Sequence, residues 1–224
     1  LQGLTQLERL QLTGRQPVLD YSALTRLRHL VLDGPRQEWP NGLLALDGLE
    51  SADLSRMPIP ALPDALFSGH ERLWRRLQLN WAALEPQAFI KAFEYVHENP
   101  AHLVDEPRMV AQYCRRRLDV LIPQREAFAT DALDAFRQEG LEGRALLDRV
   151  EALHEEYRAF NAPLLEWQAS DGARVEGIQM RASQRQVLAD RMRGCWRDAL
   201  AYRYAPSDAV VGPPLGAGEL ASET

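Results

Sequence analysis

The sequence is poor in cysteine and carries no excess of positive charge. Cys114 and Cys195 are its two cysteines, and they stand far apart in a chain of 224 residues. A chain of this length does not depend on disulfide staples, so both thiols are expected to be reduced and structural, as in a cytosol. Lysine and arginine together number 26 against 32 aspartate and glutamate residues, which gives a formal net charge of -6. Because nucleic-acid-binding domains normally present a basic surface to phosphates, this balance argues against a nucleic-acid partner.

Long apolar runs are also missing. No stretch approaches the roughly 18 uninterrupted apolar residues of a membrane-spanning helix, and no charged-then-apolar leader stands at the start. We therefore expect a soluble chain without a transmembrane segment. Leu1 already belongs to the repeat described below, so we also expect a fragment that begins partway through a larger solenoid.

The motifs of metal, nucleotide and hydrolase chemistry are absent. Five histidines occur, but none forms an H-E-x-x-H pair or accompanies a C-x-x-C motif, so no metal site is expected. Phosphate-loop, dinucleotide-binding and G-x-S-x-G motifs do not occur either. Three arginines follow Cys114 and could activate its thiol as a nucleophile, but an apolar helix residue beside a solvated basic face is the favoured interpretation. We predict no catalytic residue, no cofactor and no enzyme activity for this chain.

What the sequence does contain is a leucine repeat. The pattern L-x-x-L-x-x-L-x-L starts at Leu4 and returns after 20, then 22, then 25 residues. These spacings lie in the leucine-rich-repeat range of about 20 to 29 residues. The apolar positions are Leu4, Leu7, Leu10 and Leu12; Leu24, Leu27, Leu30 and Leu32; Leu46, Leu49, Ala52 and Leu54; and Trp74, Leu77 and Leu79.

Each L-x-L core predicts a short strand whose two leucines point the same way, because side chains alternate between the two faces of a strand. One repeat cannot bury its leucines alone, so neighbouring repeats stack and their strands form a parallel sheet on the concave side of an arc. We therefore predict an α/β leucine-rich-repeat solenoid end, with about four degenerate repeats over residues 1–83, followed by an all-α helical extension.

The residues that alternate with the leucines point into the concavity and form three columns of mostly polar side chains. A solvated face without a partner is the better interpretation for any single residue, but concave solenoid surfaces usually bind proteins. We predict that the columns together bind a protein partner. They consist of Arg9, His29, Ser51 and Arg76; Gln11, Val31, Asp53 and Gln78; and Thr13, Asp33, Ser55 and Asn80.

Beyond residue 84 the apolar period lengthens from 2 to about 3.6, which indicates helices. Residues 84–122 are predicted as a helical cap or as the helices of the last repeat, with helices at 86–99 and 107–121 and with Met109, Tyr113 and Val120 facing inward. Residues 123–205 are predicted as an antiparallel helical hairpin or bundle. Residues 206–224 are predicted as a flexible linker.

Two long helices dominate the second half. Apolar residues between 141 and 168 recur at alternating steps of four and three, and this seam favours an intramolecular hairpin over a dimeric coiled coil because Pro163 interrupts it. We expect a monomer. A final helix at 181–204 is predicted to pack inward, the alternative being a basic amphipathic helix on an anionic membrane. Its apolar face consists of Leu188, Met192, Cys195, Ala199 and Tyr202.

Three features together show a family resemblance: the degenerate repeats, the run N-W-A-A-L-E-P-Q-A-F at 80–89 and the C-W-R at 195–197. The combination resembles the repeat region of very large bacterial toxin-like and effector proteins, some of which carry a C-terminal ubiquitin-ligase domain of the novel type. The resemblance implies that the repeats select a substrate while a cysteine in a C-x-D motif takes ubiquitin as a thioester. This chain has C-R-R at 114–116 and C-W-R-D at 195–198, and neither matches, so no catalytic residue is carried over.

These observations favour a protein–protein interaction module. We expect the target-recognition or scaffold part of a larger bacterial effector or toxin, located in the bacterial cytoplasm or secreted into a host cell. Two alternatives remain at this point: part of a ubiquitin-transfer enzyme, and an inert spacer between toxin domains.

Overall fold

The computed structural model describes residues 3–15, 17–102, 104–170, 174–175 and 178–207. The chain divides into two compact units. The first comprises Leu1–Arg117 and Leu141–Val150, and the second comprises Leu118–Gly140 and Glu151–Thr224. The division falls within two helices, α3 (Glu106–Leu121) and α5 (Gly143–Ala169), so each of these helices contributes to both units.

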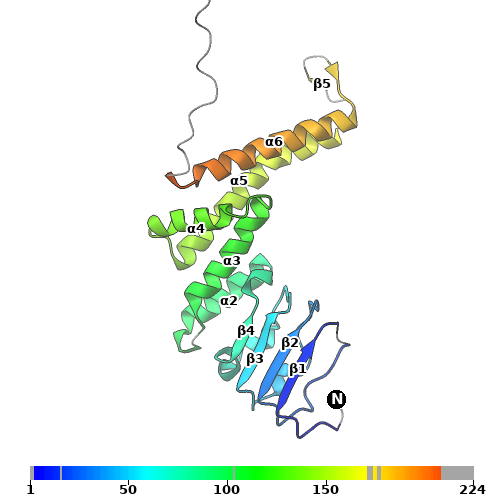
Figure 1. The fold of residues 1–224 in the computed structure, drawn as a ribbon, viewed down its shortest axis with the longest axis vertical. Helices are drawn as coiled ribbons and strands as arrows, with labels where there is room; N and C mark the ends of the chain where they lie inside the picture. Colours follow the sequence, from blue (N-terminus) through cyan, green and yellow to red (C-terminus); the bar gives the residue numbers. More distant parts are fainter. Residues whose placement is uncertain (1–2, 16, 103, 171–173, 176–177, 208–224) are drawn as a thin grey trace, which may run out of the picture. The chain divides into compact units, whose positions relative to one another are not determined.

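A four-stranded parallel sheet forms the first part of the first unit (Figure 1). Its strands follow the order of the chain: β1 (Arg9–Thr13), β2 (His29–Asp33), β3 (Ser51–Arg56) and β4 (Leu77–Leu79). Each strand contains one of the predicted L-x-L or A-x-L cores. The coarse class, parallel strands followed by helices, is thereby confirmed.

The leucines of the second, third and fourth repeats fill the core behind this sheet, whereas Leu4 is 50% exposed and Leu7, Leu10 and Leu12 are only partly buried. Leu30 and Leu32 of β2 are buried, as are their counterparts in β3 and β4, because alternate side chains of a strand share one face. The segments between the strands supply the other wall through Leu24, Leu27, Leu43, Leu46, Leu49, Leu66 and Trp74. They contain short 3-10 turns at Leu43–Ala45 and Asp64–Phe67 and the one-turn helix α1 (Glu71–Trp74).

Two further helices belong largely to the same unit, α2 (Pro86–Glu98) and α3. The Phe89 ring of α2 stacks on the Tyr113 ring of α3, with centroids 3.8 Å apart. Met109 and Tyr113 are buried as predicted. The prediction for Val120 was wrong, because this side chain is 51% exposed while Leu118 and Leu121 occupy the inward positions at that end of α3.

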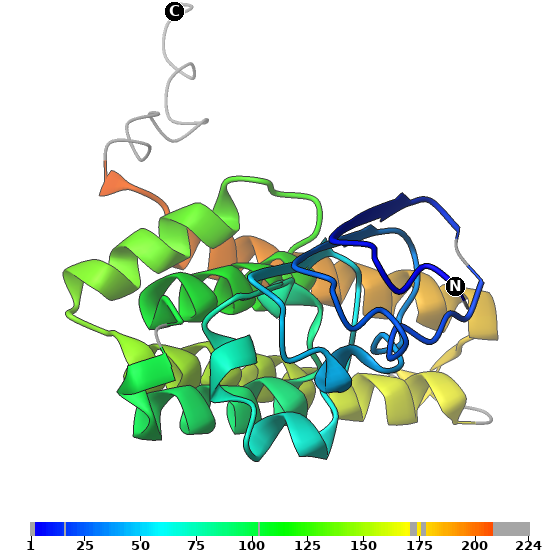
Figure 2. The same cartoon turned by 90° about the horizontal axis from the view of Figure 1, so that it is seen from below.

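In the second unit, α4 (Phe128–Gln138), the later part of α5 and α6 (Ala182–Arg203) pack together, and α5 and α6 lie side by side in both views (Figure 1 and Figure 2). The Trp196 ring of α6 lies 4.9 Å from the Tyr157 ring of α5. Tyr204, just beyond α6, meets Phe136 of α4 edge-on at 5.1 Å. The two-residue strands β5 (Arg174–Val175) and β6 (Ile178–Gln179) pair antiparallel between the long helices.

The predicted inward face of α6 is wrong. Leu188, Met192, Cys195, Ala199 and Tyr202 are all exposed, whereas Arg185, Ala189, Leu200 and Ala201 are the buried positions. The physical reason lies in Arg193, Trp196 and Arg197. Trp196 packs on α5, Arg193 Nε donates to Asn161 Oδ1 at 2.7 Å, and Arg197 lies over the Tyr157 ring. Arginine stems and a tryptophan thus take the packing role that simple hydrophobicity assigns to the apolar stripe.

No helix in the described part of the chain is both long and apolar enough to cross a membrane. The dipeptide Asp171-Gly172, which is typical of a turn, lies outside the described residues, as does the stretch 208–224 of the predicted linker.

Candidate binding face

The sheet register places the first predicted column level across neighbouring strands. Arg9 pairs with His29, and His29 pairs with Ser51. The His29 imidazole Nδ1 lies 3.0 Å from the Ser51 hydroxyl oxygen, which is hydrogen-bonding distance. Arg76 directly precedes β4, and its carbonyl oxygen accepts a hydrogen bond from the Ala52 amide at 3.0 Å. The structure therefore brings all four residues of this column together.

The second column is also level. Gln11 pairs with Val31, Val31 with Asp53, and Asp53 with Gln78. Gln11 and Gln78 are exposed, while Val31 and Asp53 are partly covered. One row across four strands is the arrangement that the repeat spacing predicts.

The third column differs from the prediction. Thr13 pairs with Asp33, but the register shifts between Val31 and Asp33, so that Arg56 rather than Ser55 lies opposite Asp33. The Arg56 guanidinium forms an ion pair with the Asp33 carboxylate at 3.1 Å. Such a shift adds one residue to one strand and re-aims the side chains beyond it.

Ser55, which does not lie opposite Asp33, is hydrogen-bonded to the Asp53 carboxylate. One oxygen of this carboxylate accepts a hydrogen bond from the Ser55 amide at 2.9 Å and another from the Ser55 hydroxyl at 2.6 Å. This local turn holds Ser55 against its own strand. Asn80 stands beyond the end of β4, at the start of a 3-10 turn (Trp81–Ala83), and is half-buried.

A cavity of about 150 Å³ lies on this face of the sheet. It is bounded by side chains of the second and third columns together with Arg56. Arg56 is the residue that sequence reasoning missed, because no signal in the repeat spacing announces a register shift. The lining residues are Gln11, Val31, Leu32, Asp33, Asp53 and Arg56.

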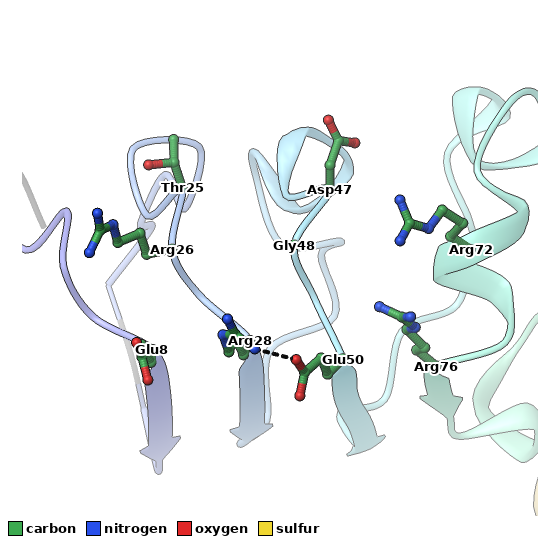
Figure 3. A pocket seen from close by; sticks show the side chains of 9 residues that line it. All are labelled: Glu8, Thr25, Arg26, Arg28, Asp47, Gly48, Glu50, Arg72 and Arg76. Atoms are coloured by element: carbon green, nitrogen blue, oxygen red, sulfur yellow. Dashed lines mark hydrogen bonds and ion pairs between the residues drawn. The ribbon is translucent and has the colours of Figure 1, made fainter.

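A larger cavity, of about 410 Å³, lies where the strands begin (Figure 3). Four of its residues directly precede the four strands, and their charges alternate along the row: Glu8, Arg28, Glu50 and Arg76. We call this set the charged row. The remaining lining residues are Thr25, Arg26, Asp47, Gly48 and Arg72.

Ion pairing within this cavity is incomplete. Arg28 donates to the Glu50 carboxylate at 2.6 Å, and Arg76 donates to the carbonyl oxygen of Leu49. Arg26 and Arg72 are exposed and form no ion pair or hydrogen bond with another described residue. Figure 3 shows Arg72 and Arg76 extending toward the loop that carries Asp47 and Glu50. The cavity therefore offers guanidinium groups with donors to spare, which suit a carboxylate or another anionic group.

Among the predicted residues only Arg76 lines this larger cavity. A signal for the others existed in the sequence, because Glu8, Arg28 and Glu50 occupy the same position of successive repeats.

The two cysteines differ in access. Cys114 is fully buried in α3, and Cys195 is exposed on α6. Within the described residues no group of three or more histidine, cysteine, aspartate or glutamate side chains is placed to hold a metal ion. Comparison of the chain with protein-family models, with curated proteins and with solved structures found no match in any of the three.

Proposed function

We propose that this chain is a protein–protein interaction module. In this account the parallel sheet is the end of a leucine-rich-repeat solenoid, and the partner binds across its outward face. The observation that carries the proposal is the level row Gln11, Val31, Asp53 and Gln78, which crosses all four strands at positions set by the register and whose outer members, Gln11 and Gln78, are exposed.

The chemistry of the two cavities narrows the kind of partner. A flat polar surface with a small cavity bounded by Asp33, Asp53 and Arg56 suits polar and basic side chains of a protein. The larger cavity, with the unpaired Arg26 and Arg72, suits an acidic side chain or a chain terminus. A partner segment with mixed charge, acidic where it meets the start of the strands, fits both.

The proposal extends to the biological setting. The resemblance set out above supports a place in a larger bacterial effector or toxin, acting in the bacterial cytoplasm or in a host cell, where this part selects the target or holds the assembly together. The charge balance supports a protein partner rather than nucleic acid.

The ubiquitin-transfer alternative is less well supported. Cys114 is buried, so its thiol lacks access to a ubiquitin thioester, and the exposed Cys195 stands in C-W-R-D rather than in C-x-D. A thioester on Cys195 that disappears in Cys195→Ser after incubation with charged conjugating enzymes would favour this alternative.

The direct test is partner capture on the immobilised chain from bacterial and host-cell lysates. A triple variant, Arg9→Ala, Gln11→Ala and Gln78→Ala, removes three exposed side chains of the face. Its matched control, Arg115→Ala, Gln87→Ala and Gln138→Ala, removes the same residue types from exposed positions on helices. A protein retained by the native chain and by the control, but lost with the triple variant, is the expected result. Equal retention by all three chains would contradict the proposal.

A further inference from the structure

Helix α6 carries an exposed apolar stripe that includes three of the large hydrophobic side chains exposed in the described part of the chain. Leu188, Met192 and Tyr202 are 37%, 46% and 68% exposed, and Cys195 and Ala199 between them are exposed as well. The five residues follow one another at steps of four, three, four and three, which is the spacing of a heptad seam. Such a seam is normally buried against another helix. α5 does not cover it, because α5 meets Arg193, Trp196 and Arg197 on a different side of α6.

The stripe is nearly symmetric about Cys195. Leu188 and Tyr202 lie equally far from it along the helix, on either side, and Met192 and Ala199 are almost equally far. If a second α6 ran antiparallel across the first, Leu188 would therefore meet Tyr202 of the second copy, and Met192 would meet Ala199. Cys195 would meet its own counterpart at the twofold axis. Self-complementarity of this kind is what a twofold interface between identical chains requires.

The flanking charges are self-complementary in the same arrangement. Arg191 and Asp198 border one side of the stripe, both are exposed, and they too lie almost symmetrically about Cys195. Antiparallel pairing places Arg191 of each copy beside Asp198 of the other, so that two intermolecular ion pairs form. Asp198 already pairs with Arg125 at 2.7 Å, and its second carboxylate oxygen is available for a further cation.

The opposite side of the stripe carries groups already engaged within the chain. Trp196 packs on Tyr157 and Phe160, and Arg203 pairs with Glu156 at 3.1 Å. A parallel pairing would place Arg191 beside Trp196 of the second copy and leave its charge without an anionic partner. The charge pattern therefore favours the antiparallel arrangement.

We propose that α6 is a homodimerisation surface, in which two copies of this chain pair antiparallel with Cys195 at the twofold axis. The stripe covers 14 helical steps, or about 21 Å at about 1.5 Å per residue. A contact of that length is smaller than a standard interface, so the dimer is weak and concentration-dependent. This inference replaces the monomer expected from the sequence, and it does not rest on the proposed function.

Sedimentation velocity on the full chain tests the interface. The native chain shifts from monomer to dimer between about 1 and about 500 µM, the range in which interfaces below the standard size associate. Met192→Lys and Arg191→Asp each abolish the shift, the first by burying a charge and the second by setting like charges together. In an Arg125→Ala background, which removes the cation that pairs with Asp198 in the same chain, Arg191→Asp combined with Asp198→Arg exchanges the two charges and restores it. Circular dichroism melting of every variant shows that it is folded.

Crosslinking tests the position of the axis. A short bis-maleimide joins two Cys195 thiols, because each thiolate adds across one maleimide double bond and no oxidant is needed. Helices packed at about 8 to 10 Å bring facing Cα atoms within about 6 Å of each other, well inside the reach of the linker. A covalent dimer forms with the native chain and is lost in Cys195→Ser, while the buried Cys114 does not replace it.

Three outcomes would overturn the proposal. The first is a chain that remains monomeric over the whole concentration range. This outcome counts against the proposal whether the Cys195 thiol reacts quickly with an alkylating reagent or is protected by another part of the same chain. The second is a dimer that Met192→Lys leaves intact, because it would use another surface. The third is failure of the charge-exchanged double variant to regain the association that Arg191→Asp loses.

Discussion

The indole Nε1 of Trp74 donates a hydrogen bond to the carbonyl oxygen of Leu66 at 2.8 Å, and both groups are buried. Trp74 stands where the earlier repeats have leucine, and its ring lies 5.1 Å from Tyr95 and stacks on Trp81 at 6.5 Å. The bond joins the 3-10 turn Asp64–Phe67 to α1, both of which lie in the long segment between β3 and β4. A tryptophan in a leucine slot therefore serves as a tether as well as a packing element.

Replacing Trp74 by phenylalanine should destabilise the chain by about 1 to 3 kcal/mol, plus the loss of packing, because the buried carbonyl of Leu66 loses its donor. Urea unfolding monitored by circular dichroism measures this change. Trp39→Phe is the matched control, because the buried Nε1 of Trp39 has no hydrogen-bond partner among the described residues. An equal loss of stability in both variants would show that ring packing, and not the hydrogen bond, accounts for the effect.

The orientation of α6 can be tested with two leucines of the same helix. Leu200 is 1% exposed and Leu188 is 37% exposed. Leu200→Ala should therefore lower the free energy of unfolding by about 2 to 5 kcal/mol, and Leu188→Ala by less than about 1 kcal/mol at protein concentrations where the chain is monomeric. Chemical denaturation of both variants at low micromolar concentration decides the matter. A larger loss of unfolding free energy for Leu188→Ala than for Leu200→Ala would show that the apolar stripe is buried in the core.

The arginines of the larger cavity should separate stability from binding. Replacing both Arg26 and Arg72 by alanine should change the free energy of unfolding by less than about 0.5 kcal/mol, since neither side chain pairs with another described residue. Arg76→Ala should cost more, because it removes the half-buried hydrogen bond to the Leu49 carbonyl. Urea titrations measure both values. Once a partner has been captured, its affinity for the Arg26 and Arg72 double variant should be lower than for the native chain and should depend less on salt concentration. If the affinity and its salt dependence are unchanged, this cavity is not part of the surface that binds the partner.

The Arg28–Glu50 ion pair should contribute little to stability. Both side chains are about half exposed, and surface pairs of this kind are worth roughly 0 to 1 kcal/mol. Glu50→Gln should therefore leave the denaturation midpoint within about 0.5 M urea of the native value, at a slope of about 1 to 3 kcal/mol/M. A much larger shift would mean that the charged row holds the strands together rather than facing a partner.

The strands and the helices were predictable because each rests on a strong local signal. The L-x-L cores place β1 to β4, and the apolar period together with Pro86 and Pro100 bounds α2. The level rows of the binding face follow directly from the repeat spacing. These features depend on periodicity alone, which a single sequence displays.

Features that depend on tertiary packing were not predictable in the same way. The register shift that replaces Ser55 by Arg56 opposite Asp33 arises from the fit between two strands. The side of α6 that packs on α5 is set by Trp196 and by two arginine stems, whereas hydrophobicity alone singles out a stripe that lies in solvent. An apolar stripe of this spacing is typical of a helix that packs on another helix, but it does not tell whether that second helix belongs to the same chain.

The most direct test of the central claim is the affinity of a captured partner for the native chain and for the triple variant Arg9→Ala, Gln11→Ala and Gln78→Ala. Biolayer interferometry at fixed salt provides the measurement, with the matched helix variant at Arg115, Gln87 and Gln138 as the control. We expect a loss of about tenfold or more for the triple variant, with the affinity of the control unchanged. Equal affinities for all three chains would contradict it, because the partner would then bind somewhere other than the outward face of the sheet.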